Sequence, residues 1–206
     1  QLFDSAFQNS GQVCIAMKRL YVHDSIYDEV VDELATIAND TIIGDGLEQG
    51  TKLGPLQNKM QYEKVKELIE SAREDGNIVA GGEVPDQSGY FIRPTIVRDV
   101  TEGSRIVDEE QFGPVLPVIR FSDESDAIAR ANNSDYGLGG SVWSSDLDRA
   151  YDVANQMNTG TVWINKHAEL DPGIPFGGSK QSGLGNELGM EGLKEFTQLK
   201  MINMAR

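Results

Sequence analysis

Apolar residues recur at helical spacing in two stretches of the first half of the chain. The earlier stretch follows a strand-like run at residues 19–23 and begins at Asp24-Ser25, a pair typical of helix starts. Its apolar face comprises Ile26, Tyr27, Val30, Val31, Leu34 and Ile37. The later stretch ends at Gly76, a typical helix cap, and its apolar face comprises Tyr62, Val65, Leu68, Ile69 and Ala72. The pattern predicts two amphipathic helices, the first joined directly to a strand.

Shorter apolar runs alternate with helical patterns further along the chain. We expect strands at residues 78–80, 115–121, 140–143 and 161–165, and capped helices at residues 123–132 and 146–157. The extended run at residues 90–100 contains Pro94, which predicts an edge strand or a bulge because proline has no N–H to donate. This alternation predicts an α/β fold, with a largely parallel sheet covered by helices on both faces.

The last part of the chain has a different composition. Residues 172–189 contain six glycines, too many for a regular element, and a short helix at 191–196 and a strand-like run at 200–204 follow. A chain of 206 residues is long enough for one well-buried domain. We therefore expect a single core over residues 1–197, with a C-terminal strand or tail at 198–206.

The charge and the cysteine count narrow the class of protein. A formal net charge of -15 without any cluster of lysine or arginine argues against nucleic acid and anionic membranes as partners. No apolar run approaches the roughly 20 residues of a membrane span, and no basic-then-apolar leader begins the chain, so we expect a cytoplasmic protein. The single Cys14 excludes an internal disulfide, and with His23 and His167 far apart no metal site is expected.

The first segment that is hard to explain by packing is Asn9-Ser10-Gly11-Gln12-Val13-Cys14-Ile15. A thiol that follows these polar residues lies where backbone N–H groups or a helix start favour the reactive thiolate. The alternative is that Val13, Cys14 and Ile15 form a buried apolar triplet. The residues by themselves leave both interpretations open.

The second segment is Asp108-Glu109-Glu110-Gln111-Phe112-Gly113-Pro114. Its Glu110 carboxylate could accept hydrogen bonds from both hydroxyls of a ribose, and Phe112 could face a flat ring. The alternative is an acidic surface turn ahead of the strand at 115–121.

The third segment, residues 175–185, superficially resembles a loop that cradles phosphate. Its Gly178-Ser179-Lys180 lacks the upstream glycine at P-loop spacing, so we exclude a nucleoside triphosphate site. The glycines instead predict a backbone loop that packs closely beneath a pocket, with Phe176 in the pocket wall.

Taken in their order along the chain, these segments resemble the aldehyde dehydrogenase superfamily. Residues 9–14 resemble its cysteine signature, and residues 110–114 resemble its cofactor motif. The further matching stretches are Gly54-Pro55 with Gln61, residues 132–138, residues 160–165, and residues 175–178 with Lys180, Ser182 and Gly183. The resemblance covers essentially the whole chain and implies the family's catalytic domain over residues 1–197, with 198–206 as an oligomerisation tail.

The resemblance implies a mechanism centred on Cys14. The thiolate attacks an aldehyde, and the backbone N–H of Cys14 and a side-chain amide hold the oxyanion of the thiohemiacetal. Hydride then passes to the nicotinamide of NAD or NADP, and a glutamate-activated water releases the carboxylic acid from the thioester.

The resemblance also implies roles for residues around Cys14. Glu110 would bind the nicotinamide ribose, Phe112 would pack near that ribose and ring, and Gln61 and Leu138 would contact the cofactor more remotely. The residues that would line the aldehyde pocket are Val13, Ile15, Leu170 and Phe176. Asn165 would support the cysteine loop.

The family places further functional parts upstream of its cysteine signature. These are the dinucleotide-binding domain that holds most of the NAD or NADP, the amide of the oxyanion hole, the general base, and a hairpin that pairs with the terminal strand in homodimers and homotetramers. No glutamate here matches the general base. We expect residues 1–206 alone to be inactive, and residues 200–204 to be unpaired or engaged in a non-native oligomer.

Two other functions stay open. An acylating dehydrogenase would pass the thioester to coenzyme A or phosphate, and a degenerate assembly module would need neither Cys14 nor Glu110. The apolar residues expected around the pocket, with no arginine among them, favour an aliphatic or aromatic aldehyde over a semialdehyde that carries a second carboxylate.

Overall fold

The computed structural model describes residues 1–206, which divide into two compact units, Gln1–Ala131 and Asn132–Arg206. The expectation of a single core over residues 1–197 therefore differs from the structure. The first unit contains one four-stranded sheet, and the second contains two two-stranded sheets. We describe the units separately.

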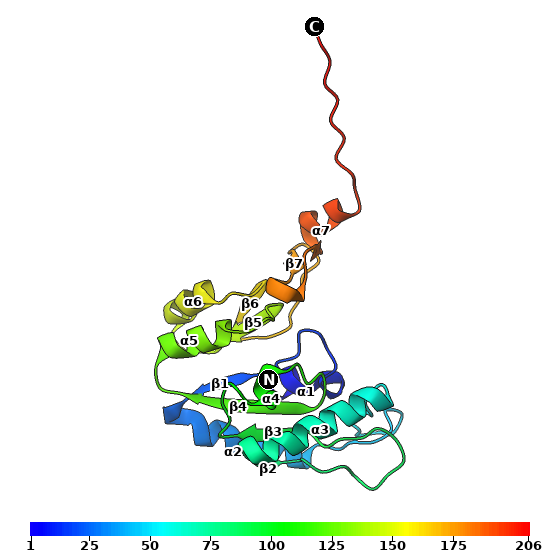
Figure 1. Ribbon diagram of the computed structural model, residues 1–206, viewed down its shortest axis with the longest axis vertical. Helices are drawn as coiled ribbons and strands as arrows, with labels where there is room; N and C mark the ends of the chain where they lie inside the picture. Colours follow the sequence, from blue (N-terminus) through cyan, green and yellow to red (C-terminus); the bar gives the residue numbers. More distant parts are fainter. The chain divides into compact units, whose positions relative to one another are not determined.

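The first unit is built on a four-stranded sheet with the order β1-β4-β3-β2 (Figure 1). The strands are β1 (Leu20–His23), β2 (Asn77–Ala80), β3 (Thr95–Arg98) and β4 (Val115–Phe121). β4 runs parallel to both β1 and β3, while β2 is antiparallel to β3. The predicted α/β fold with a largely parallel sheet is confirmed.

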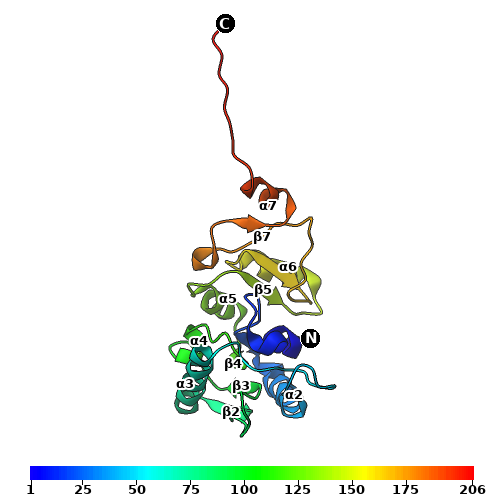
Figure 2. The same cartoon turned by 90° about the vertical axis from the view of Figure 1, so that its right-hand side faces the viewer.

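Helices cover both faces of this sheet, as Figure 2 shows edge-on. α1 (Leu2–Phe7) and α2 (Tyr27–Asp40) share one buried cluster, and α3 (Lys59–Asp75) and α4 (Arg105–Asp108) share another. Side chains of β4 alternate between the two clusters because successive residues of a strand point to opposite faces: Leu116 and Val118 join the first, Val115 and Ile119 the second. Burial on both faces explains why β4 reads as an almost continuous apolar run.

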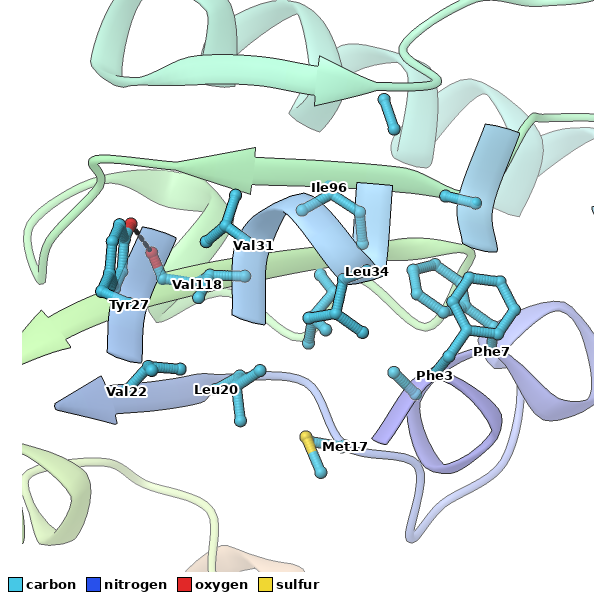
Figure 3. Packing of buried hydrophobic residues seen from close by; sticks show 14 of the residues in the cluster. Phe3, Phe7, Met17, Leu20, Val22, Tyr27, Val31, Leu34, Ile96 and Val118 are labelled. Carbon is cyan, nitrogen blue, oxygen red and sulfur yellow. Dashed lines mark hydrogen bonds between the residues drawn. The ribbon is translucent and has the colours of Figure 1, made fainter. Parts of the chain in front are cut away.

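The cluster on the α2 face is well packed (Figure 3). The rings of Phe3 and Phe7 stack at 4.5 Å, and Tyr27, Val31 and Phe7 are fully buried. The Tyr27 hydroxyl donates to the carbonyl of Val118 at 2.9 Å and accepts from the N–H of Asp99 at 3.0 Å. The buried phenol therefore ties α2 to the sheet without an unsatisfied polar atom.

Pro94 corrects one expectation from the sequence. β3 begins at Thr95, directly after the proline, and lies between β4 and β2 in the sheet, so the strand is not at an edge. The edge strand is β2, whose register with β3 shifts between Ile78 and Ala80. Proline is accommodated because it precedes the strand's hydrogen-bonded residues.

The first unit also contains the short 3-10 helices η1 (Gln8–Gly11) and η2 (Asp24–Ile26). α5 (Glu124–Asn132) follows β4, and Asp123 caps it by accepting from the N–H of Asp126 at 2.8 Å. None of the helices combines the length and apolar character needed to cross a membrane.

The second unit contains two small sheets. β5 (Gly139–Val142) pairs in parallel with β6 (Thr161–Ile164), and β7 (Phe176–Gly177) pairs antiparallel with β8 (Asn186–Glu187). Asp146 caps the N-terminus of α6 (Leu147–Gln156), and its carboxylate accepts a hydrogen bond from the N–H of Arg149 at 3.0 Å. The remaining elements are η3 (Lys180–Ser182) and α7 (Gly189–Glu195).

The terminal segment forms no strand. Residues 198–206 are exposed and belong to no helix or strand, in contrast to the strand-like pattern at residues 200–204. A strand needs a hydrogen-bonded neighbour, and no other segment pairs with these residues.

Candidate active site

Cys14 lies in an exposed turn between η1 and β1. The turn is closed by the N–H of Ala16, which donates to the carbonyl of Val13 at 2.9 Å, and the thiol side chain is exposed. The interpretation of Cys14 as a buried packing residue is therefore wrong, while Val13 and Ile15 beside it are partly buried. The suggested helix start is also absent, because α1 ends at Phe7.

The backbone ahead of the thiol has an unusual conformation. Asn9, Ser10 and Gly11 have φ angles of 52°, 56° and 72°, so three successive residues lie in the left-handed region. This conformation is strained for residues with a side chain, although asparagine tolerates it better than most. The strain is offset by long-range contacts that hold this loop in place.

Two side-chain hydrogen bonds connect the cysteine loop to the segment before α3. The Ser10 hydroxyl donates to the carbonyl of Gly54 at 2.7 Å, and the side-chain oxygen of Gln12 accepts from the N–H of Gln57 at 2.9 Å. Residues 54–57 thus support the loop that presents Cys14.

A close backbone contact joins the cysteine loop to the second segment. A Cβ atom on Gly11 would overlap the carbonyl oxygen of Gly113, so glycine is required here both for this approach and for its positive φ. Two motifs that stand far apart in the sequence are therefore adjacent in the first unit, and Cys14 and Glu110 each lie three residues from this contact.

Lys18 lies at the same contact, and the sequence carried no signal for it. Its ammonium nitrogen is 3.0 Å from the carbonyl oxygen of Gly113, to which it donates. Burial lowers the pKa of Lys18 to about 8, although the nearby Glu110 carboxylate acts in the opposite direction. In the sequence, Lys18 cannot be distinguished from a surface lysine, because its partner Gly113 is 95 positions away.

In the second segment, Glu110 and Phe112 differ in their exposure to solvent. Glu110 is exposed, and Phe112 is partly buried with a φ of 47°, an uncommon conformation for an aromatic residue. The Gln61 side-chain amide donates to the carbonyls of Gln111 at 2.6 Å and of Phe112 at 3.2 Å. Gln61 therefore holds the strained turn in the structure, a supporting role that the resemblance did not indicate.

Gln111 anchors the same turn from inside. Its side chain is fully buried and its amide donates to the carbonyl of Ile106, while its side-chain oxygen has no hydrogen-bond partner. Outside the turn, the Lys64 ammonium donates to the Glu110 carbonyl at 2.9 Å, which leaves the carboxylate of Glu110 exposed.

The remaining candidate residues lie in the second unit. Leu138 and Phe176 are partly buried, and Leu170 is exposed between β6 and β7. Asn165, with a φ of 55°, accepts from the N–H of Ser144 at 2.9 Å and donates to its carbonyl at 2.8 Å. Both polar ends of the Asn165 side chain thus bind the segment that follows β5.

The glycine-rich segment makes close backbone contacts within the second unit. A Cβ on Gly160 would overlap the carbonyl of Gly177, so these backbones meet directly. The Lys180 ammonium donates to the carbonyls of Asn132 at 2.9 Å and Ser134 at 2.8 Å. This lysine therefore supports the backbone at residues 132–134.

Comparison with known proteins tests the resemblance. The model of the aldehyde dehydrogenase family matches residues 1–202, and the chain belongs to this family. Phenylacetaldehyde dehydrogenase of Pseudomonas fluorescens is 42% identical over 202 residues, which cover 97% of this chain and 40% of that protein. Succinate-semialdehyde dehydrogenase [NADP(+)] of Deinococcus radiodurans is 46% identical over 195 residues, covering 94% of this chain and 41% of that protein.

Solved structures agree with the family assignment. The NAD+ complex of aldehyde dehydrogenase from Bacillus cereus superimposes with a TM-score of 0.93 at 44% identity, covering 97% of this chain and 41% of that one. Betaine aldehyde dehydrogenase from Staphylococcus aureus in complex with NAD+ has a TM-score of 0.91 at 39% identity. The match covers 95% of this chain and 40% of that chain. The chain thus spans about two fifths of the length of these relatives.

Proposed function

We propose that residues 1–206 carry the nucleophile of an NAD(P)-dependent aldehyde dehydrogenase, with Cys14 as the attacking thiol. The observation that carries the proposal is the contact of Gly11 with Gly113, which brings the exposed Cys14 turn to the segment of Glu110 and Phe112. Family membership adds the chemistry, because relatives of this chain are named as dehydrogenases of aldehydes.

The proposed reaction begins with addition of the Cys14 thiolate to the aldehyde carbon. A C–S bond forms, the carbonyl π electrons move to oxygen, and the backbone N–H of Cys14 donates to this oxyanion. Loss of hydride from the same carbon converts the thiohemiacetal to a thioester. Water then adds to the thioester, the C–S bond breaks, and the carboxylic acid leaves with the Cys14 thiolate restored and one proton released to solvent.

The residues beside Cys14 fit a nicotinamide cofactor. The exposed Glu110 carboxylate offers two acceptor oxygens for a ribose diol, and Phe112 offers an aromatic face on a turn held by Gln61. When bound, the cofactor supplies the two-electron acceptor that takes the hydride. NAD+ is present in complexes of structural relatives, and one relative is named for NADP, so we propose NAD or NADP, with Leu138 as a further cofactor contact.

Substitution of the thiol tests the proposal. In the complete protein that contains these residues, Cys14→Ser should lower kcat by at least about a thousandfold, since the reaction loses its nucleophile. Incubation of the wild type with aldehyde and cofactor, followed by acid quench and mass spectrometry, should show the acyl group on the Cys14 peptide.

A product assay distinguishes the acceptor of the acyl group. Carboxylic acid formed without added coenzyme A or phosphate supports hydrolysis by water, whereas a strict requirement for either would assign an acylating dehydrogenase. Unchanged turnover in Cys14→Ser would remove Cys14 from the mechanism altogether.

We propose an apolar aldehyde as the substrate. Val13 and Ile15 flank the thiol, and we propose from the resemblance to the family that Leu170 and Phe176 also contribute to aldehyde binding in the complete protein. None of these four residues is an arginine that could bind a second carboxylate. Relatives of similar identity are named for phenylacetaldehyde and for succinate semialdehyde, so similarity alone does not choose between them. We expect kcat/KM for phenylacetaldehyde to be at least about tenfold above that for succinate semialdehyde. This ratio corresponds to a difference of about 1.4 kcal/mol in activation free energy.

Two further proposals concern the 206-residue polypeptide. It spans only about 40% of its relatives, which argues that it does not complete turnover alone. Its tail exposes Leu199, Met201, Ile202 and Met204 by 84% or more, which favours pairing with another chain in a homodimer or homotetramer. Cys14-dependent oxidation by this polypeptide would contradict the first, and light scattering that shows the complete protein as a monomer would contradict the second. We also propose that Asn165 supports the cysteine loop. We propose the cytoplasm as the compartment, because a single cysteine without a disulfide is typical of proteins from a reducing environment.

A further inference from the structure

The Lys18 side chain joins two segments of the candidate site, yet the proposed reaction does not use it. Its ammonium donates to the Gly113 carbonyl at 3.0 Å, and a Cβ on Gly11 would reach both groups. The missing side chain of Gly11 thus leaves the space that the Lys18 ammonium occupies.

Stability does not account for a lysine at this place. The Gly113 carbonyl already accepts from the N–H of Val115 at 2.9 Å, so it would be satisfied without Lys18. An ammonium has three donor hydrogens, and this one has a single hydrogen-bond partner. Burial lowers the pKa of Lys18 to about 8, which means that the fold disfavours its charged form. The hydrogen bond to Gly113 therefore comes with a desolvation cost for the ammonium.

What Lys18 does contribute is a directed contact. Gly113 follows Phe112, whose φ of 47° makes the turn intrinsically unfavourable, and Gln61 holds that turn from the α3 side. Lys18 holds it from the side of the cysteine loop, and the negative Glu110 is close enough to act on the charge of its ammonium. The turn is therefore fixed from two directions at the residues that face the proposed cofactor.

We propose that Lys18 is a positioning residue, which holds the Glu110–Phe112 turn against the Cys14 loop so that Glu110 and Phe112 are preorganised for the nicotinamide ribose. This inference rests on the proposed function, because it assumes that the turn binds the cofactor. Lys18 acts through Gly113 and does not take part in the chemical steps.

The test compares Lys18→Met with a matched variant in the complete protein. Methionine has a similar length and no charge, and Lys66→Met removes an exposed lysine of α3 whose partner is Glu63. Isothermal titration with NAD+ and with NADP+ should give a Kd about tenfold higher in Lys18→Met, the loss of one charged hydrogen bond, and an unchanged Kd in Lys66→Met. KM for the cofactor should rise in parallel, while kcat at saturating cofactor stays within about twofold. Lys18→Arg, which keeps a charged donor, should recover part of the loss.

Thermal unfolding separates positioning from a structural role. Lys18→Met should unfold at nearly the same temperature as the wild type, because the Gly113 carbonyl keeps its hydrogen bond from the N–H of Val115. An unchanged cofactor Kd, or a lower unfolding temperature with kcat reduced as much as affinity, would overturn the proposal for Lys18. A wild type that binds cofactor but forms no thioester on Cys14 would overturn the proposed function, and the Kd comparison would still decide the role of Lys18.

Discussion

The two units of the chain differ in how much apolar surface they bury. The first unit has a cluster of fully buried side chains on each face of its sheet. In the second unit only Ala150 and Trp163 are buried apolar residues. Its exposed large apolar residues include Tyr151 on α6, Ile174, Leu184, Leu193 on α7 and Phe196.

The second unit relies instead on close backbone contacts. The Gly137 carbonyl accepts from the N–H groups of Gly160 at 2.9 Å and Ser179 at 2.8 Å, and Gly160 meets the carbonyl of Gly177. Hydrogen bonds of this kind contribute less than apolar burial and depend on the absence of side chains. The two units should therefore respond to different substitutions: the first to loss of side-chain volume, and the second to added side-chain volume.

The largest expected effect is loss of volume in the first unit. Leu116→Ala removes a fully buried side chain of β4 and should lower the free energy of unfolding by about 3 kcal/mol, from lost burial and the remaining cavity. The matched variant in the second unit is Leu193→Ala on α7, 60% exposed, with an expected change within about 0.5 kcal/mol. Urea unfolding followed by circular dichroism measures both, and equal effects would break the comparison.

Added volume should affect the second unit. Gly160→Ala places a methyl group on the carbonyl of Gly177 and should destabilise this unit by about 2 kcal/mol. Gly46→Ala is the control, since its Cβ would meet no atom within 4 Å. Fluorescence of Trp143 and Trp163, which both lie in the second unit, follows the unfolding. If Gly160→Ala and Gly46→Ala had the same free energy of unfolding, the contact between Gly160 and Gly177 would contribute little to stability.

The last expected effect concerns the acid stability of the first unit, and it appears only at low pH. Burial opposes ionisation of Glu102, but hydrogen bonds from Arg130, Tyr21 and Thr101 lower its pKa to about 2. A carboxylate with a depressed folded-state pKa contributes stability above its unfolded pKa of 4.5, and that contribution is lost as the pH falls toward 2.

Glu102→Gln should therefore remove about 2 kcal/mol of the pH dependence of unfolding between pH 4.5 and 2. Glu169→Gln is the control, because Glu169 pairs with Lys166 at the surface of the second unit, where such pairs contribute little. The measurement is the slope of unfolding free energy against pH, and a wild-type slope equal to that of Glu102→Gln would contradict the assignment.

Local pattern accounts for much of the first unit's secondary structure. β4 spans the predicted residues, and most of the predicted apolar faces of α2 and α3 are buried, since periodicity follows from which side of an element is buried. Ile26 and Ile37 were predicted on the apolar face of the first helix but are exposed, and Ile26 lies in η2, ahead of α2. At Pro94 the expected edge position was wrong, while the alternative expectation of a bulge agrees with the register shift between β2 and β3. The strand-like pattern at residues 200–204 was also wrong, because strand position and strand pairing depend on neighbours from elsewhere in the chain.

The sequence by itself determined the family, through motifs in a shared order, and the α/β alternation of elements. Only the tertiary structure decided that Cys14 is exposed, that Gly11 meets Gly113, and that the Lys18 ammonium is desolvated. Lys18 and Gly113 stand 95 positions apart, so nothing local to either residue could indicate their contact. Steric fit and desolvation are properties of the packed chain, because they depend on which distant atoms folding places around a residue.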